Sequence, residues 1–169
     1  MLKASSRFVA LCVLAGLPAS VLAENFDFTY TGSAGVSAFG SLTATSNGDG
    51  TFTATSGFIT VTGGAVMGTW NLVTNPGGTA ASLSPFAMFI FDNQLLPVAD
   101  PKLTTSGLLF SDGIVEVNIW GNSPGSYSHW EAMGGGYAVS SDGQFTLTPA
   151  PGSVALLGLG GVVAARRRR

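Results

Sequence analysis

Between residues 24 and 147 the chain is a succession of short apolar or alternating runs, each closed by turn-forming residues. Phe26, Phe28 and Tyr30 alternate with polar residues, which is the period of a strand with one buried face. The cluster Asn47-Gly48-Asp49-Gly50 separates two β-type runs, which is a strong hairpin signal. No stretch shows a sustained helical period with capping residues. The pattern predicts an all-β fold, an antiparallel β-sandwich-like single domain.

The positions of the remaining strands follow from the same pattern. Further strands are expected over 36–45, 51–61, 65–73, 86–91, 108–110, 114–120, 137–139 and 144–148. The run 86–91 is apolar throughout, which is typical of a strand buried on both faces. Within 114–120, Glu116 and Asn118 alternate with apolar residues and are expected on the opposite, polar face. Loops are expected over 93–101 and 121–136, and a hairpin turn at 141–143.

Charge is scarce in this chain and unevenly distributed. Charged residues make up 9% of it, against about 25% in typical globular proteins. Residues 24–147 hold all nine acids and a single cation, Lys102, so this range carries a net charge of −8. Such a domain repels phosphate backbones, and nucleic acid is not expected as a partner. The one cysteine, Cys12, lies outside this range, so no disulfide is expected within it.

Residues 1–23 have the three parts of a secretory signal peptide. Two cations precede an apolar block over 8–17, and Val21 and Ala23 put small residues at the positions that signal peptidase reads. Ten residues of helix rise about 15 Å, well short of a bilayer core of about 30 Å. We therefore expect a signal helix that is cleaved after Ala23; a buried helix of the folded protein is the alternative.

Residues 148–169 combine a proline motif, an apolar stretch and a basic cluster. The stretch 154–165 would rise only about 18 Å as a helix, but a helix counted from Pro149 with snorkelling arginine side chains could span a bilayer. The basic cluster consists of Arg166, Arg167, Arg168 and Arg169. Arginines are stabilised on the cytoplasmic side of a membrane, which favours a transmembrane helix over the alternative of a buried core helix.

This segment resembles the PEP-CTERM sorting signal of bacterial exported proteins, which joins a Pro-Glu-Pro motif to a transmembrane stretch rich in Leu and Gly and a short arginine cluster. Pro149, Pro151 and Gly152 match the motif, and Ala150 stands where the family has Glu. The resemblance implies an exported protein that is anchored in the inner membrane, cut by a protease called exosortase, and released to the cell envelope, surface or extracellular matrix. Its processing partners would be signal peptidase and exosortase. The resemblance carries no information about residues 24–147.

The residue inventory of the central domain disfavours catalysis and metal binding. His129 is the only histidine, so neither a hydrolytic triad nor a multi-histidine zinc site can be assembled. We expect His129 on the surface, and Asp112 and Glu116 as solvated acids. No catalytic residue, metal or cofactor is therefore predicted, and the domain is expected to be non-enzymatic.

Three aromatic residues suggest an alternative function for this domain. Trp120, Tyr127 and Trp130 could stack on pyranose faces, which would make the domain a carbohydrate-binding module for extracellular polysaccharide. The competing interpretation places Trp120 in the core and the other two over a loop. The sequence thus predicts an exported cell-surface or matrix protein with a β-domain, and polysaccharide binding as the alternative role of that domain.

Overall fold

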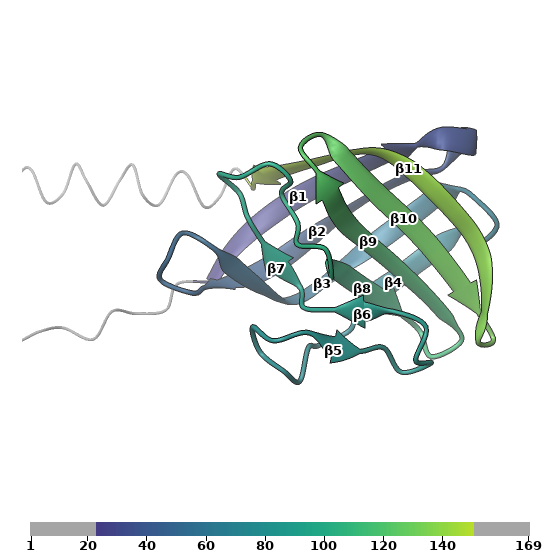
Figure 1. Ribbon diagram of the computed structural model, residues 1–169, viewed down its shortest axis with the longest axis horizontal. Helices are drawn as coiled ribbons and strands as arrows, with labels where there is room; N and C mark the ends of the chain where they lie inside the picture. Colours follow the sequence, from purple (N-terminus) through teal and green to yellow (C-terminus); the bar gives the residue numbers. More distant parts are fainter. Residues whose placement is uncertain (1–22, 151–169) are drawn as a thin grey trace, which may run out of the picture.

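The computed structural model describes residues 23–150 (Figure 1). Val21, Pro151, Gly152 and the arginines 166–169 lie outside the described residues, as do the bodies of both expected terminal helices. The strands are β1 (Ala23–Gly32), β2 (Ser37–Ser46), β3 (Phe52–Gly63), β4 (Gly68–Leu72), β5 (Ser82–Leu83), β6 (Ile90–Phe91), β7 (Gln94–Leu95), β8 (Leu108–Ser111), β9 (Val115–Ser123), β10 (Ser126–Met133) and β11 (Gly136–Pro149). One 3₁₀ turn, η1 (Ser33–Gly35), joins β1 to β2. Within residues 23–150 no helix has the length and apolar character needed to cross a membrane.

Eight strands of a nine-stranded antiparallel sheet close on themselves as a barrel (Figure 1), and the short β7 adds to the start of β3. Their order is β2, β1, β11, β10, β9, β8, β4 and β3, and β3 pairs back onto β2. The prediction of an all-β antiparallel fold is confirmed. The two packed sheets of the expected sandwich do not form. Instead, β2 and β3, the first and last of these eight strands, pair along their length and close the sheet into a barrel. Each of the eight barrel strands therefore has a paired neighbour on both sides. The two register shifts along β2–β3 are the kind of bulge that bends a sheet.

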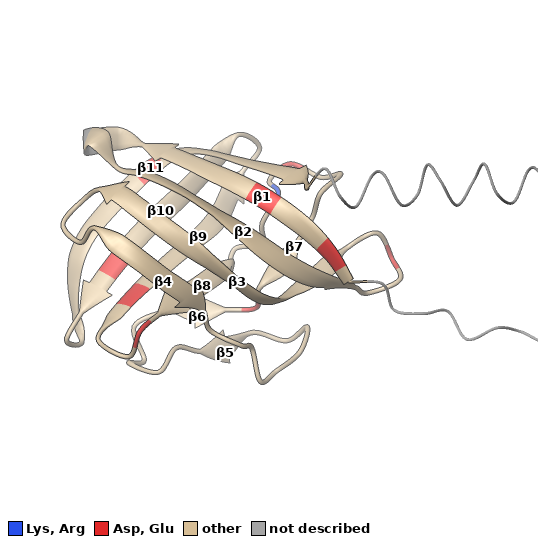
Figure 2. Ribbon diagram, turned by 180° about the vertical axis from the view of Figure 1, so that it is seen from behind, with Lys and Arg blue, Asp and Glu red and all other residues tan. Residues whose placement is uncertain are grey.

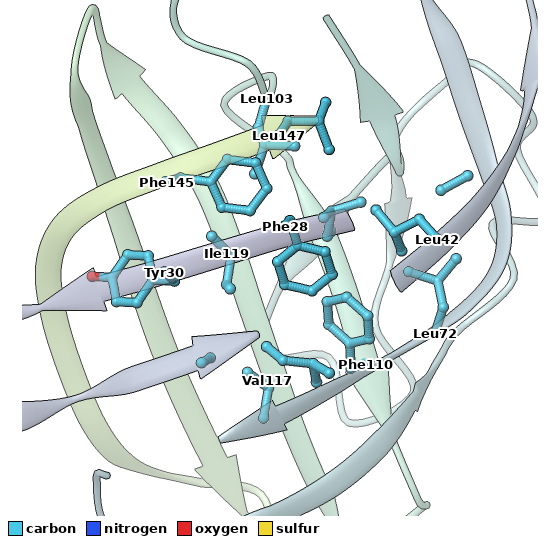
Figure 3. Close-up of a cluster of buried hydrophobic side chains, with 14 of the residues drawn as sticks. Phe28, Tyr30, Leu42, Leu72, Leu103, Phe110, Val117, Ile119, Phe145 and Leu147 are labelled. Atoms are coloured by element: carbon cyan, nitrogen blue, oxygen red, sulfur yellow. The ribbon is translucent and has the colours of Figure 1, made fainter. Parts of the chain in front are cut away.

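The inside of the barrel is a packed hydrophobic core. Phe28 lies between Phe145, whose ring centroid is 5.5 Å away, and Phe110, at 5.9 Å (Figure 3). Opposite Phe28 on β2 stands Gly40, where a Cβ would lie 2.6 Å from the Phe28 ring. The missing side chain of Gly40 therefore gives this ring its space.

Two expectations for the C-terminal half are wrong. Residues 121–136, expected as a loop, contain β10, which pairs with both β9 and β11. The residues 141–143, expected as a turn, lie within the continuous strand β11. The hairpin turn is at Gly134 and Gly135, whose φ angles of 58° and 80° favour glycine. The sequence pattern did not predict β10 as a strand, because the inward face of β10 carries polar as well as apolar side chains.

The run 86–91 is also not a strand buried on both faces. Only Ile90 and Phe91 are extended, as β6, and the Ile90 side chain is 58% exposed. The connection between β4 and β8 instead packs against the outside of the barrel. There Phe89 and Phe91 form a second apolar cluster with Leu109 and Ala132. The connection therefore buries part of the outer face of β8, β9 and β10.

Candidate functional site: the aromatic face of β9, β10 and β11

Three neighbouring strands bring aromatic rings together on the outside of the barrel. Trp120 on β9 and Trp130 on β10 are partly exposed, with ring centroids 5.8 Å apart and planes at 52°. Tyr137 on β11 is 59% exposed and meets Trp130 edge-on at 5.0 Å and 87°. We name Trp120, Trp130 and Tyr137 the aromatic face. Phe89, from the covering connection, packs 5.8 Å from Tyr137 and supports one side of the face.

A bulge in the β10–β11 pair places Tyr137 in this group. Val139 pairs with Glu131 and Tyr137 pairs with Ala132, so Ala138 is the extra residue between them. Ala132 has its side chain on the outer face of β10, like Trp130, and Tyr137 shares that face. The sequence analysis did not single out Tyr137, because strand alternation cannot show which face a residue takes when a bulge shifts the register.

A shallow hollow of about 300 Å³ lies beside Trp130 and Tyr137. Ala138, Val139 and Ser140 complete its lining. Ser140 pairs directly with Trp130 across the β10–β11 ladder. The hollow thus has two aromatic walls that meet edge-to-face and a hydroxyl-bearing side chain beside them.

A row of hydrogen-bonded side chains lies beside Trp120 on the outer surface of the barrel. The Trp120 Nε1–H donates to Asn122 Oδ1 at 2.9 Å, and Asn122 Nδ2 donates to Ser128 Oγ at 2.9 Å. Ser128 Oγ in turn donates to Asp142 Oδ1 at 2.6 Å. This row crosses β9, β10 and β11 in register, since Ser128 is the ladder partner of both Trp120 and Asp142. It orients the Trp120 ring and places amide and carboxylate groups next to it.

Tyr127, the third residue of the expected sugar site, lies on the other side of the sheet. Its side chain is buried inside the barrel, where its hydroxyl accepts the Lys102 backbone N–H at 2.7 Å and donates to Asp100 at 3.2 Å. Burial raises the pKa of Tyr127. The structure therefore brings Trp120 and Trp130 together and removes Tyr127 from the site.

His129 is also inside the barrel, so its expected surface position is wrong. His129 and Glu131 are both fully buried, with 3.0 Å between His129 Nε2 and Glu131 Oε1. The Tyr30 ring stacks on the imidazole at 5.2 Å, and the Val66 N–H donates to Glu131 Oε2 at 3.1 Å. Because the surrounding core encloses the pair, its role is to tie β10 to the β3–β4 turn.

Of the two acids expected to be solvated, Asp112 is exposed and Glu116 is buried. Glu116 is fully buried under the β4–β8 connection, where it accepts the Ser84 hydroxyl at 2.8 Å and the Phe86 N–H at 2.9 Å. Asp112 is exposed, as expected, and accepts two backbone N–H groups at 2.9 Å in the β8–β9 turn. These hydrogen bonds lower the pKa of Asp112. Among residues 23–150 no group of three His, Cys, Asp or Glu side chains is placed to hold a metal ion.

The two ends of the described chain lie side by side at one pole of the barrel (Figure 1). Phe26 pairs with Pro149, and the Ala150 N–H donates to the Asn25 carbonyl at 2.8 Å. Pro149, the first residue of the expected sorting motif, is thus the last residue of β11. Ala23, the expected last residue of the signal peptide, begins β1.

Within residues 23–150 the acidic residues are scattered over the fold. Figure 2 shows the acidic residues on separate strands and turns of the barrel. Comparison with known proteins adds no assignment to this geometry: no family model, curated protein or solved structure matches the chain.

Proposed function

We propose that this chain is an exported protein whose barrel domain is displayed at the cell surface or in the extracellular matrix after temporary anchoring in the inner membrane. The observation that carries the proposal is the pairing of β1 with β11. This pairing brings the expected signal-peptidase site at Ala23 and the expected sorting motif from Pro149 to one pole. A domain tethered there presents its sides and its opposite pole away from the membrane.

The sequence supports this proposal through its two terminal segments. Residues 1–23 have the order of a signal peptide, and residues 148–169 have that of a stop-transfer helix followed by arginines on the cytoplasmic side. Processing by signal peptidase and an exosortase-type protease then releases a non-enzymatic domain. Since Pro149 is paired in β11 and Ala150 is hydrogen-bonded to β1, we place the C-terminal cut beyond Ala150, where it leaves the barrel whole.

Intact-mass analysis of membrane, surface and secreted fractions tests the proposal. The full chain is expressed in a bacterium that has an exosortase and, in parallel, in a strain from which the protease is deleted. We expect a released species that begins at Glu24 and has lost residues 166–169, and an anchored species in the deletion strain. A released species that still ends at Arg169 would contradict processing. Accumulation of the unprocessed chain in the cytoplasm would contradict export.

A variant with Arg166 to Arg169 replaced by serine separates anchoring from cleavage. Without the cytoplasmic charges the helix loses its stop-transfer signal, and we expect uncut protein in the soluble exported fraction. A matched control replaces Asp27, exposed on β1, by serine and keeps the tail unchanged. Wild-type fractionation of the arginine variant would overturn the assigned role of the cluster.

Polysaccharide binding is the second candidate function. The observation that favours it is that Trp120 and Trp130, two of the three residues suggested by the sequence, share one partly exposed outer face. The ligand class and the residues that bind it are developed below.

A further inference from the structure

We infer that the aromatic face binds an uncharged polysaccharide, with one pyranose ring in the hollow beside Trp130 and Tyr137 and the chain continuing past Trp120. The inference rests on the proposed function, because a domain that is exported meets such polymers. It adds Tyr137, Ser140 and Asn122 to the site and removes Tyr127.

The first argument is the shape and chemistry of the rings. A pyranose presents apolar C–H faces that pack against flat aromatic rings, and its ring edge presents hydroxyls. Trp130 and Tyr137 stand at 87° to each other, so they form a corner that contacts a sugar on a face and on an edge. The hollow at this corner is about 300 Å³, at the lower end of the range found for small-molecule sites. It therefore suits one sugar unit of a polymer.

The second argument is the supply of hydrogen-bonding groups around the rings. Ser140 lines the hollow, and the exposed side chains of Asn122 and Asp142 lie beside Trp120, where both hydrogen-bond to the buried Ser128. A sugar hydroxyl needs such donors and acceptors when it leaves water. A purely apolar partner would instead leave these groups without their water partners. The mixture of rings and polar groups favours a carbohydrate.

The third argument is electrostatic. Residues 24–147 carry a net charge of −8, and Asp142 lies in the polar row of the site itself. Anionic polymers are repelled by this charge, and so is a second copy of the same domain. An uncharged polysaccharide does not meet this repulsion.

The fourth argument is the position of the site relative to the tether. Tyr137 lies near the start of β11, and Pro149 ends that strand twelve residues later. At about 3.4 Å per residue, the two are separated by about 40 Å of strand. The hollow is thus near the pole opposite to the one where both chain ends leave the barrel, and it stays accessible while the protein is anchored.

Binding of the full chain, purified in mild detergent, to defined polymers tests the inference. The probes are dextran, cellulose and chitin as uncharged polymers and alginate as an anionic one, followed by gel retardation for the soluble polymers and by depletion for the insoluble ones. We expect binding to at least one uncharged polymer and none to alginate. Trp130→Ala and Tyr137→Ala should each weaken that binding about tenfold, the equivalent of one lost ring contact.

Further variants protect the test against misfolding. Tyr137→Phe retains the ring and should bind like the wild type, whereas Ser140→Tyr places a β-compatible side chain in the hollow and should abolish binding. Phe39→Ala removes a half-exposed ring from the outer face of β2 and serves as the matched control. It should leave binding unchanged.

Several outcomes would overturn the inference. These are no binding to any uncharged polymer, unchanged binding in Trp130→Ala, Tyr137→Ala and Ser140→Tyr, or stronger binding to alginate than to uncharged polymers. Association of the wild type into dimers that Tyr137→Ala abolishes would assign the face to self-association instead. If the polymers bind as expected but the protein is not exported, the proposed function fails while the site stands.

Discussion

Removal of the Glu131 carboxylate should be among the most damaging single changes to this barrel. Glu131 is fully buried, pairs with His129 at 3.0 Å and accepts the Val66 N–H at 3.1 Å. In Glu131→Ala the His129 ring loses its polar partner and the Val66 N–H loses its acceptor. Each buried polar group that is left without its hydrogen-bond partner costs about 1–3 kcal/mol, and this substitution orphans two such groups. We therefore expect the free energy of unfolding to fall by about 4 kcal/mol.

Urea denaturation followed by tryptophan fluorescence measures this loss. With a slope of about 2 kcal/mol per molar urea, the midpoint should fall by about 2 M. Glu131→Gln keeps an oxygen for one contact and should lose about half as much. The double variant His129→Leu with Glu131→Met removes both polar partners, so it should be less destabilised than the two single changes added together.

The exposed acid Asp27 on β1 provides the control, and Asp27→Ala should move the midpoint by less than about 0.3 M. If Glu131→Ala shifted the midpoint no more than Asp27→Ala, the carboxylate would not be a buried partner of His129 and Val66. If the double variant lost the full sum of the single changes, the two side chains would not act as a pair.

Two further predictions concern packing and pH. Gly40→Val would force a side chain into the Phe28 ring and the neighbouring strand, so we expect the free energy of unfolding to fall by about 3 kcal/mol or more. Calorimetry should then show a melting temperature that is lower by about 10 °C. An unchanged melting temperature would contradict the close approach of Gly40 to Phe28. Hydrogen bonds lower the pKa of both Asp49 and Asp112 in the folded state. Their contribution to stability is therefore present above the unfolded pKa of about 3.9 and is lost as pH falls through the lower folded values, and replacing both by Asn should flatten the loss of stability below about pH 4 in urea titrations.

Local sequence pattern was sufficient for the first half of the barrel. The alternation at Phe26, Phe28 and Tyr30 correctly predicted a strand with one buried face, and the cluster at 47–50 correctly predicted the β2–β3 turn. Both signals depend on residues close together in the chain. Strand period and turn chemistry are set by such neighbours, so they could be recognised without the fold.

The same reasoning failed where distant segments provide the partners. Residues 126–133 do not look like a strand with one buried face, because His129 and Glu131 stand at its inward positions. Burial of these two is possible only because they face each other and the β3–β4 turn reaches Glu131. Glu116 shows the same effect on the outside, where a turn thirty or more residues earlier supplies its donors.

By itself, the sequence determined the β-rich class, the antiparallel hairpins and the acidic charge, since these follow from composition and local spacing. Only the tertiary structure decided that the sheet closes, because closure depends on the β1–β11 pairing across more than a hundred residues and on the β2–β3 ladder. It also decided which aromatic residues share a surface: Tyr127 faces inward by strand alternation, and the bulge at Ala138 brings Tyr137 beside Trp130.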